Sequence, residues 1–390
     1  MTHADWFSGF RLNFEQQGKR ARELLKAARS GDARALGRFR SLPPKLAEAQ
    51  HLIAQDLRFQ SWAELKHHTA SMARERAAIG HAAPLDADLR TLHIRCGSDI
   101  RETLQSACFQ GDFLEHSYPY LAVRVRADTL PGQEQLLDSA TFERVVIWSE
   151  FDCYDQLVLL RLLAHFAAHR SPTRLELINV GAFPGAARFI GLGQLPPEAL
   201  RMLWTTRRPV TPGQLSLGLH GWTAFTSEDP RQLAALARGG TPELPLLAPA
   251  LQRHLRELPA LENGLGFTQQ MALSLLYARP ASLNELFAKM THELDPLPGQ
   301  GDLQVHDRVL PMIQARPPLL VPQPGTDGEG RARPPWTDVL ALTDAGRASL
   351  ENRLDFLSLE PPARWVGGVE IAPDRPDWRW DEKRLDAVRR

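Results

Sequence analysis

Strand-like and helix-like segments alternate between residues 90 and 181, and this order constrains the fold more than any other feature of the chain. We expect strands at RTLHIRC, YLAVRVRA, ERVVIWS and RLELINVG, which are rich in β-branched and apolar residues. We expect helices at DIRETLQSAC and YDQLVLLRLLAHFAAH. The alternation predicts an α/β domain, in which helices flank a mainly parallel, open sheet.

Helical segments precede and follow this region. Asp32 and Ser61 stand where helices are expected to begin, and residues 1–78 are predicted to form an amino-terminal helical arm. The α/β domain with its helical extension is then expected over residues 88–240, after the linker-like AAIGHAAPLDAD.

The remaining domain is expected over residues 245–390. FTQQMALSLLYA, SLNELFAKM and DLQVHDRVLPMI predict three helices, and PLLV and VLALT predict a strand pair. A proline- and glycine-rich loop is expected at 316–335, and RWVGGVEI and DWRW are expected to close the domain as hairpin strands. Three helices with a two-stranded ribbon resemble a winged helix-turn-helix.

Polar residues gather where two of the predicted strands end. In open parallel sheets, ligands bind outside the carboxyl ends of the strands. The loop after the first strand and the loop after VVIW are therefore candidate ligand-binding loops. Candidate ligand-binding residues are Gly97, Ser98, Asp99 and Gln156, and candidate catalytic residues are Glu150, Asp152 and Asp155.

The acidic residues restrict the ligands that such a site would accept. They would repel a bare phosphate, but they suit ribose hydroxyls, an amine, or a Mg²⁺ ion that bridges to phosphate. A carboxylate among them is also a candidate general base. Helix capping is the alternative explanation: Asp99 with Glu102 fits a capping box, and Asp152 fits an N-cap. Three carboxylates within six residues exceed what one cap requires, and the sequence does not specify a metal.

Charge and composition limit the possible partners. The formal net charge is zero, so no global field attracts the chain to nucleic acid or membrane. Residues 11–45, however, contain ten Lys or Arg against three acidic residues. This stretch is either a phosphate-contacting face or a solvated helix face. Residues 259–322 contain four basic and six acidic residues, which favours a packing or dimerisation role for the winged-helix-like part over duplex binding.

The expected location is the cytoplasm. The start of the sequence lacks the basic and apolar regions of a signal peptide, and no apolar run approaches the roughly 20 residues of a membrane span. Three cysteines, without ligand-like spacing, fit reduced thiols.

Several motifs resemble a bacterial family called domain of unknown function eighteen thirty-five. They are HIRCGSDIRETL, VIWSEFDCYDQLVLLRLL and GLGQLPPEAL, and LQRHLRELPALENGLGFTQQMALSLL resembles the helical and winged part usually found with that family. AARSGDARALGRF is similar to an amino-terminal helical segment of ankyrin-like bacterial proteins. The resemblance implies no established reaction. It implies that one feature comprises Gly97, Ser98, Asp99, Asp152, Asp155 and Gln156.

Three functions remain open from the sequence. The first is binding of a nucleotide or polar small molecule at the strand ends, as a hydrolase, a transferase or a degenerate relative of one. The second is a regulatory or nucleic-acid-associated role, which would use the basic arm and the winged-helix-like tail. The third is a protein-interaction scaffold, and the sequence leaves the oligomeric state open, a homo-oligomer included.

Overall fold

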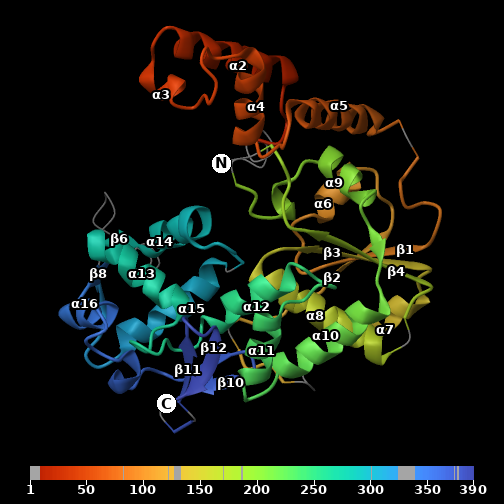
Figure 1. The fold of residues 1–390 in the computed structure, drawn as a ribbon. Coiled ribbons are helices and arrows are strands. Elements are labelled where there is room, and N and C mark those ends of the chain that lie inside the picture. Colours follow the sequence, from red (N-terminus) through yellow and green to blue (C-terminus); the bar gives the residue numbers. More distant parts are fainter. Residues whose placement is uncertain are drawn as a thin grey trace, which may run out of the picture. The chain divides into compact units, whose positions relative to one another are not determined.

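A computed structural model describes residues 9–81, 83–121, 123–126, 133–169, 171–185, 188–299, 301–323, 339–372, 374–375 and 377–390 (Figure 1). The chain divides into two compact units. The first comprises residues 1–115, 141–148 and 172–209, and the second comprises residues 116–140, 149–171 and 210–390. The first unit therefore contains the predicted helical arm together with most of the sheet.

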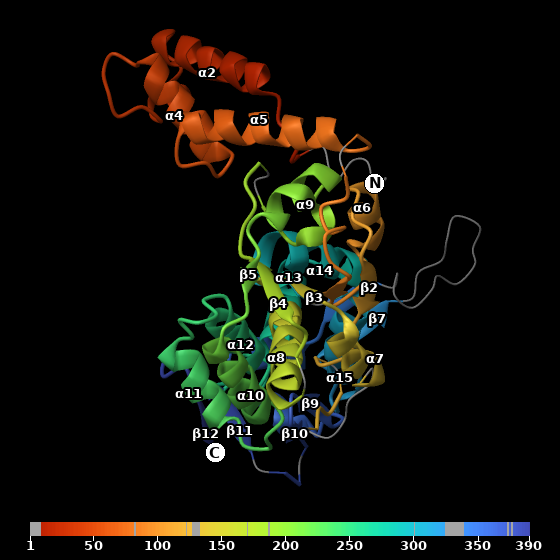
Figure 2. The ribbon, with the colours of Figure 1, turned by 90° about the vertical axis from the view of Figure 1, so that its right-hand side faces the viewer.

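The arm of the first unit is helical, as predicted. Its helices are α2 (Phe14–Arg29), α3 (Ala33–Leu36), α4 (Leu46–Asp56) and α5 (Trp62–Ala78). Asp32 and Ser61 are the N-caps of α3 and α5, because their side chains accept hydrogen bonds from the backbone N–H groups three residues later. Figure 2 shows α2 and α4 side by side, and their buried faces share an apolar core that includes Leu25, Ile53 and Leu65.

A five-stranded, mainly parallel sheet confirms the predicted α/β class. The strand order is β2-β1-β3-β4-β5. The strands are β1 (Thr91–Arg95), β2 (Asp112–Glu115), β3 (Arg144–Glu150), β4 (Arg174–Val180) and β5 (Arg208–Pro209). β1 pairs in parallel with both β2 and β3, whereas β5 runs antiparallel to β4. Helices α6 (Arg101–Ser106) and α9 (Pro197–Trp204) pack on the sheet through a core that includes Leu104, Leu200 and Val146.

The prediction of a strand at YLAVRVRA is wrong. Residues 120–121 and 123–126 form no strand, and the strand beside β1 is β2, which lies earlier in the sequence. Tyr120 is instead buried against the rings of Trp222 and Phe225, and the Val125 N–H donates to the Gly367 carbonyl. Burial in the second unit thus overrides the strand propensity of this segment.

The second unit is mainly helical. Its core contains two long helices that cross closely, α8 (Cys153–Ala168) and α10 (Pro212–Phe225). Further helices are α7 (Gln133–Asp138), α11 (Arg231–Gly239), α12 (Leu247–Leu255), α13 (Phe267–Ala278), α14 (Leu283–Lys289), α15 (Asp302–Gln314) and α16 (Asp344–Leu350). No helix that the structure describes combines the length and apolar character that a bilayer crossing requires.

Small antiparallel sheets complete the second unit. The strands are β6 (Ala281–Ser282), β7 (Leu320–Gln323), β8 (Val339–Leu342), β9 (Arg364–Val366), β10 (Val369–Ile371), β11 (Trp378–Asp381) and β12 (Asp386–Arg389). The pairing of β7 with β8 confirms the predicted strand pair. RWVGGVEI and DWRW both form strands, as predicted, but they belong to separate hairpins: β9 pairs with β10, and β11 pairs with β12. The winged-helix assignment stays a prediction. Residues 324–335 of the predicted loop lie outside the described residues.

Candidate functional site

The acidic turn follows directly from the buried strand β3. Every residue of β3 is buried, and Glu150 is its last residue. The chain then turns, and α8 begins at Cys153 with Asp152 as its N-cap. Asp155 lies in the first turn of α8, where a negative charge interacts favourably with the helix dipole. A strand end and a helix start thereby bring three acidic residues together.

The three acidic side chains form a compact cluster. Glu150, Asp152 and Asp155 each offer one carboxylate oxygen, and these oxygens all lie within 4.8 Å of one another. All three residues are buried, with exposed fractions of 5%, 5% and 3%. Like charges at such distances repel one another, and the repulsion is weakly screened away from solvent. A bound cation would offset this repulsion.

Hydrogen bonds fix the turn that carries the cluster. The backbone N–H of Asp155 donates to Asp152 Oδ1 over 2.8 Å, and the backbone N–H of Glu150 donates to Asp155 Oδ1 over 3.0 Å. The Gln156 side-chain amide donates to the Ser149 hydroxyl and to the Glu150 carbonyl. Capping therefore accounts for Asp152, as predicted for the alternative explanation, but capping does not require the Glu150 side chain.

Carboxylate oxygens are ligands for hard divalent cations. Mg²⁺ and Ca²⁺ both prefer oxygen, and Mg²⁺ is commonly held by one or two carboxylates together with substrate phosphates. Within the described part of the chain, no other group of three His, Cys, Asp or Glu residues has ligand atoms this close together. The cluster is therefore the candidate metal centre.

Gly299 closes one side of this cluster, a feature that the sequence did not predict. A side-chain carbon at position 299 would come within 2.5 Å of Asp152 Oδ1, so only glycine fits without displacing the carboxylate. The adjacent Cys153 is buried, and burial raises the pKa of its thiol well above the ordinary value. Cys153 is thus a poor candidate for a thiolate nucleophile.

The other predicted loop belongs to the first unit. Arg95 and Trp148 are partners in the register of β1 with β3, and Gly97, Ser98 and Asp99 follow the end of β1. The Arg95 guanidinium donates to both carboxylate oxygens of Asp99 over 3.1 Å. Asp99 therefore does not cap α6, whose N-cap is Ile100.

A second polar feature that the sequence did not predict lies inside the second unit. Arg253 forms ion pairs with Glu257 over 2.6 Å and with Asp295 over 2.7 Å. Burial would raise the pKa of Glu257, but the charges of Arg253 and Arg308 and a hydrogen bond from Thr268 lower it to about 2. Glu257 stands four residues after Arg253, but Thr268, Asp295 and Arg308 come from other helices and loops, so no local motif in the sequence identifies the whole set.

Comparison with known proteins adds no functional assignment. No protein-family model matches the sequence, and no curated protein matches it. The resemblance to the family called domain of unknown function eighteen thirty-five therefore stays a prediction.

Proposed function

We propose that Glu150, Asp152 and Asp155 bind a divalent cation, Mg²⁺ in the first instance, and that the cation recruits a phosphate-bearing nucleotide or another polar small molecule. The observation that carries the proposal is the approach of three buried carboxylate oxygens to within 4.8 Å of one another. The capping bonds hold two of these side chains in place before any ligand arrives, which lowers the entropic cost of binding.

The proposed cation would resolve the charge conflict between acidic residues and a phosphate. Three carboxylates alone repel a phosphate, whereas a divalent cation attracts the carboxylates and the phosphate at once. The same arrangement fits a hydrolase, a transferase, or a relative that has kept only binding. Turnover of a nucleotide in the presence of Mg²⁺ would distinguish the first two from the third.

Calorimetric titration of the intact chain with Mg²⁺ and Mn²⁺ tests the cation site. The D152N/D155N variant removes two charges, but asparagine caps helices about as well as aspartate, so the start of α8 is preserved. We expect this variant to lose cation binding and to retain its fold. D32N is the matched control, because Asp32 caps α3 through the same bond to a backbone N–H over 2.8 Å. Undiminished binding by D152N/D155N would contradict the proposal.

A basic surface on α2 supports a second candidate function, contact with the phosphates of a nucleic acid. An open hollow of about 320 Å³ on α2 is lined by Arg22, Lys26 and Arg29, together with Leu25 and Ser30. This lining contains three basic residues and no acidic residue. Binding through phosphate contacts releases counterions, so the affinity falls steeply as the salt concentration rises.

Fluorescence anisotropy with a labelled duplex and a labelled single strand tests this second function. We expect R22Q/K26Q to weaken binding to all sequences alike and to reduce the dependence of affinity on salt concentration. E23Q is the control on the same helix, because it leaves the three basic residues intact. An affinity that does not change between low and moderate salt would contradict the phosphate contacts.

A further inference from the structure

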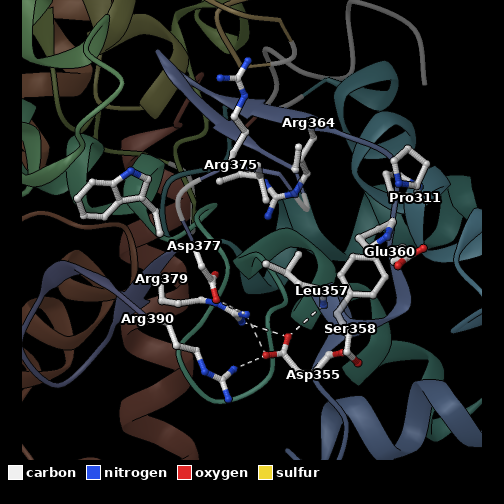
Figure 3. A pocket seen from close by; sticks show the side chains of 16 residues that line it. Pro311, Asp355, Leu357, Ser358, Glu360, Arg364, Arg375, Asp377, Arg379 and Arg390 are labelled. Carbon is white, nitrogen blue, oxygen red and sulfur yellow. Dashed lines mark hydrogen bonds and ion pairs between the residues drawn. The ribbon is translucent and has the colours of Figure 1, made fainter.

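A pocket of about 470 Å³ lies in the second unit, and none of its lining residues belongs to the acidic cluster. Strands β9 and β11 and the short 3₁₀ helix η5 (Phe356–Leu359) contribute to its lining (Figure 3). Its size falls within the range of small-molecule sites. Phe356, Ile371 and Trp378 provide apolar lining, and four arginines also line the pocket.

The acidic residues of the lining are engaged by arginines or lie exposed. The Asp355 carboxylate forms ion pairs with Arg379, over 2.9 Å, and with Arg390, as the dashed lines in Figure 3 show. Arg379 also pairs with Asp377. Glu360 lies exposed. The charges of Arg379 and Arg390 are therefore compensated within the protein.

Arg364 differs from the other arginines of the pocket. It is the first residue of β9, and its exposed fraction is 9%. Among the residues that the structure describes, neither of its terminal guanidinium nitrogens has a hydrogen-bond partner. Figure 3 shows its side chain extending toward the middle of the lining residues, with no dashed line to any of them. Burial, and then the nearby charge of Arg308, lower the pKa of Arg364 to about 9.

One neighbouring carboxylate compensates this charge only in part. Arg364 Nη2 lies beside Gly266, near Glu257 Oε2, and the charge of Glu257 opposes the lowering of the Arg364 pKa. Glu257 is shared with other groups, because its Oε1 accepts hydrogen bonds from Arg253 and Thr268. The buried polar network of Arg253, Arg308 and Arg364 with Glu257 and Asp295 holds three guanidinium groups and two carboxylates. A buried charge without a hydrogen-bonded partner is strongly unfavourable. Binding of an anion in this pocket would therefore be favourable.

We propose that the pocket binds a small organic anion. Its oxyanion is attracted by the buried charge of Arg364, whose terminal nitrogens are covered by protein atoms in the unliganded chain and turn toward the pocket to donate hydrogen bonds. Its apolar or aromatic body contacts Trp378, Phe356 and Ile371. A planar guanidinium can donate two parallel hydrogen bonds to a carboxylate or to a phosphate group. The shared chemistry is therefore an oxyanion on an apolar body. This site shares no lining residue with the acidic cluster, and the proposal does not rest on the proposed function.

Calorimetric titration of the full chain with phenyl phosphate, benzoate, inorganic phosphate and the neutral benzamide tests the pocket. We expect at least one of the two aromatic anions to bind, more tightly than inorganic phosphate and benzamide. The tighter of phenyl phosphate and benzoate identifies the preferred oxyanion. The proposal would be overturned if neither phenyl phosphate nor benzoate bound. It would also be overturned if benzamide bound as tightly as benzoate and phenyl phosphate did not bind.

Matched variants assign the binding to Arg364. R364M should weaken anion binding by roughly tenfold to a hundredfold, as expected for the loss of charged hydrogen bonds. Without ligand, R364M should raise the melting temperature, because it removes a buried charge that is only partly compensated. R375M is the control, because Arg375 also lines the pocket but pairs with Glu370 over 2.7 Å. This substitution should change the affinity for the anion by about twofold or less.

A second variant tests the pocket without changing its charge. Ala372 lines the pocket and is only partly buried, so A372W should fill the cavity and abolish binding while the unit stays folded. Anion binding that survives both R364M and A372W would show that the anion binds elsewhere and would overturn the proposal.

Discussion

Asp155 and Asp152 are joined by a hydrogen bond of 2.8 Å, in which the Asp155 backbone N–H donates to Asp152 Oδ1. The same bond starts α8 and holds two members of the acidic cluster in place. Helix capping and cation binding are therefore compatible at this turn. Substitutions that keep the cap but remove the charge can separate them.

The first prediction concerns this cap. D152A removes the acceptor for the Asp155 N–H and should lower the free energy of unfolding by about 1 kcal/mol. D152N keeps an acceptor and should change this free energy much less. Urea unfolding of both variants in a buffer with a metal chelator provides the measurement. Equal losses for D152A and D152N would show that the charge of Asp152, and not its cap, stabilises the fold.

Local sequence signals predicted the helix starts and the acidic turn well. Asp32, Ser61 and Asp152 were all expected to cap helices, and each accepts the expected hydrogen bond from a backbone N–H three residues later. Such bonds join residues close in sequence, so a short motif contains all the partners. The clustering of Glu150 with Asp155 follows from the same local geometry.

Competing contacts and long-range contacts limit prediction from the sequence. Asp99 fits a helix cap, but its carboxylate pairs instead with Arg95, four residues earlier, and a local motif does not show which of the two contacts forms. Tyr120 begins a segment of strand-like composition, but its ring packs against the rings of Trp222 and Phe225, about a hundred positions later. The Arg364 pocket likewise depends on strands and loops whose packing no local pattern specifies.

The second prediction concerns the close crossing of α8 and α10. A side-chain carbon at Gly218 of α10 would lie 2.3 Å from the Leu163 Cβ of α8. G218A should force the two helices apart and lower the free energy of unfolding by about 1–3 kcal/mol, as overpacking does. Thermal unfolding provides the measurement.

Gly239 is the matched control for this substitution. It ends α11, and nothing lies within 4 Å of the position that its side-chain carbon would take. G239A should be neutral or stabilise the protein by up to about 1 kcal/mol, because alanine loses less conformational freedom on folding. If G218A behaved like G239A, the helix crossing would be looser than the structure shows.

The third prediction is a dependence of stability on pH through His165. Burial, followed by the charges of His169 and Arg161, lowers the pKa of His165 from 6.5 to about 4. Between these values the unfolded chain binds a proton that the folded chain does not bind. The contribution of neutral His165 is thus complete above pH 6.5 and is lost as the pH falls toward 4, with a slope of up to about 1.4 kcal/mol per pH unit.

Replacing His165 should flatten this dependence. H165Q removes the titrating group but keeps a donor for the Leu136 carbonyl, which lies 3.2 Å from His165 Nε2. Urea unfolding at pH 7 and at pH 5 should show a smaller difference for H165Q than for the wild type. H220Q is the control, because His220 is exposed on α10. An unchanged difference in H165Q would show that His165 is not buried in its neutral form.

The fourth prediction concerns the completely buried Glu198 of α9. Its carboxylate pairs with Arg11 over 2.9 Å and with Arg76 of α5 over 2.6 Å, and both arginines are partly exposed. Removing one side of such a pair is costly when the charge left behind is buried. R11A/R76A leaves the buried Glu198 carboxylate without either arginine. It should therefore lower the free energy of unfolding by about 3 kcal/mol or more. E198Q leaves only guanidinium groups that solvent can reach. It should therefore lower the free energy of unfolding by about 1 kcal/mol.

A mutant cycle isolates this effect from other contacts of the two arginines. In the E198Q background the arginines no longer face a buried carboxylate at position 198. Adding R11A/R76A should therefore lower the free energy of unfolding much less than it does in the wild type. The penalty of R11A/R76A alone should also shrink between pH 7 and pH 4. Burial without the arginines raises the pKa of the Glu198 carboxyl group, which then binds a proton and becomes neutral, whereas in the wild type the arginines hold this pKa below 4.5. Urea unfolding of the four proteins at pH 7 and at pH 4 measures both effects. Additive losses at both pH values would mean that Arg11 and Arg76 stabilise the fold by contacts other than those with Glu198.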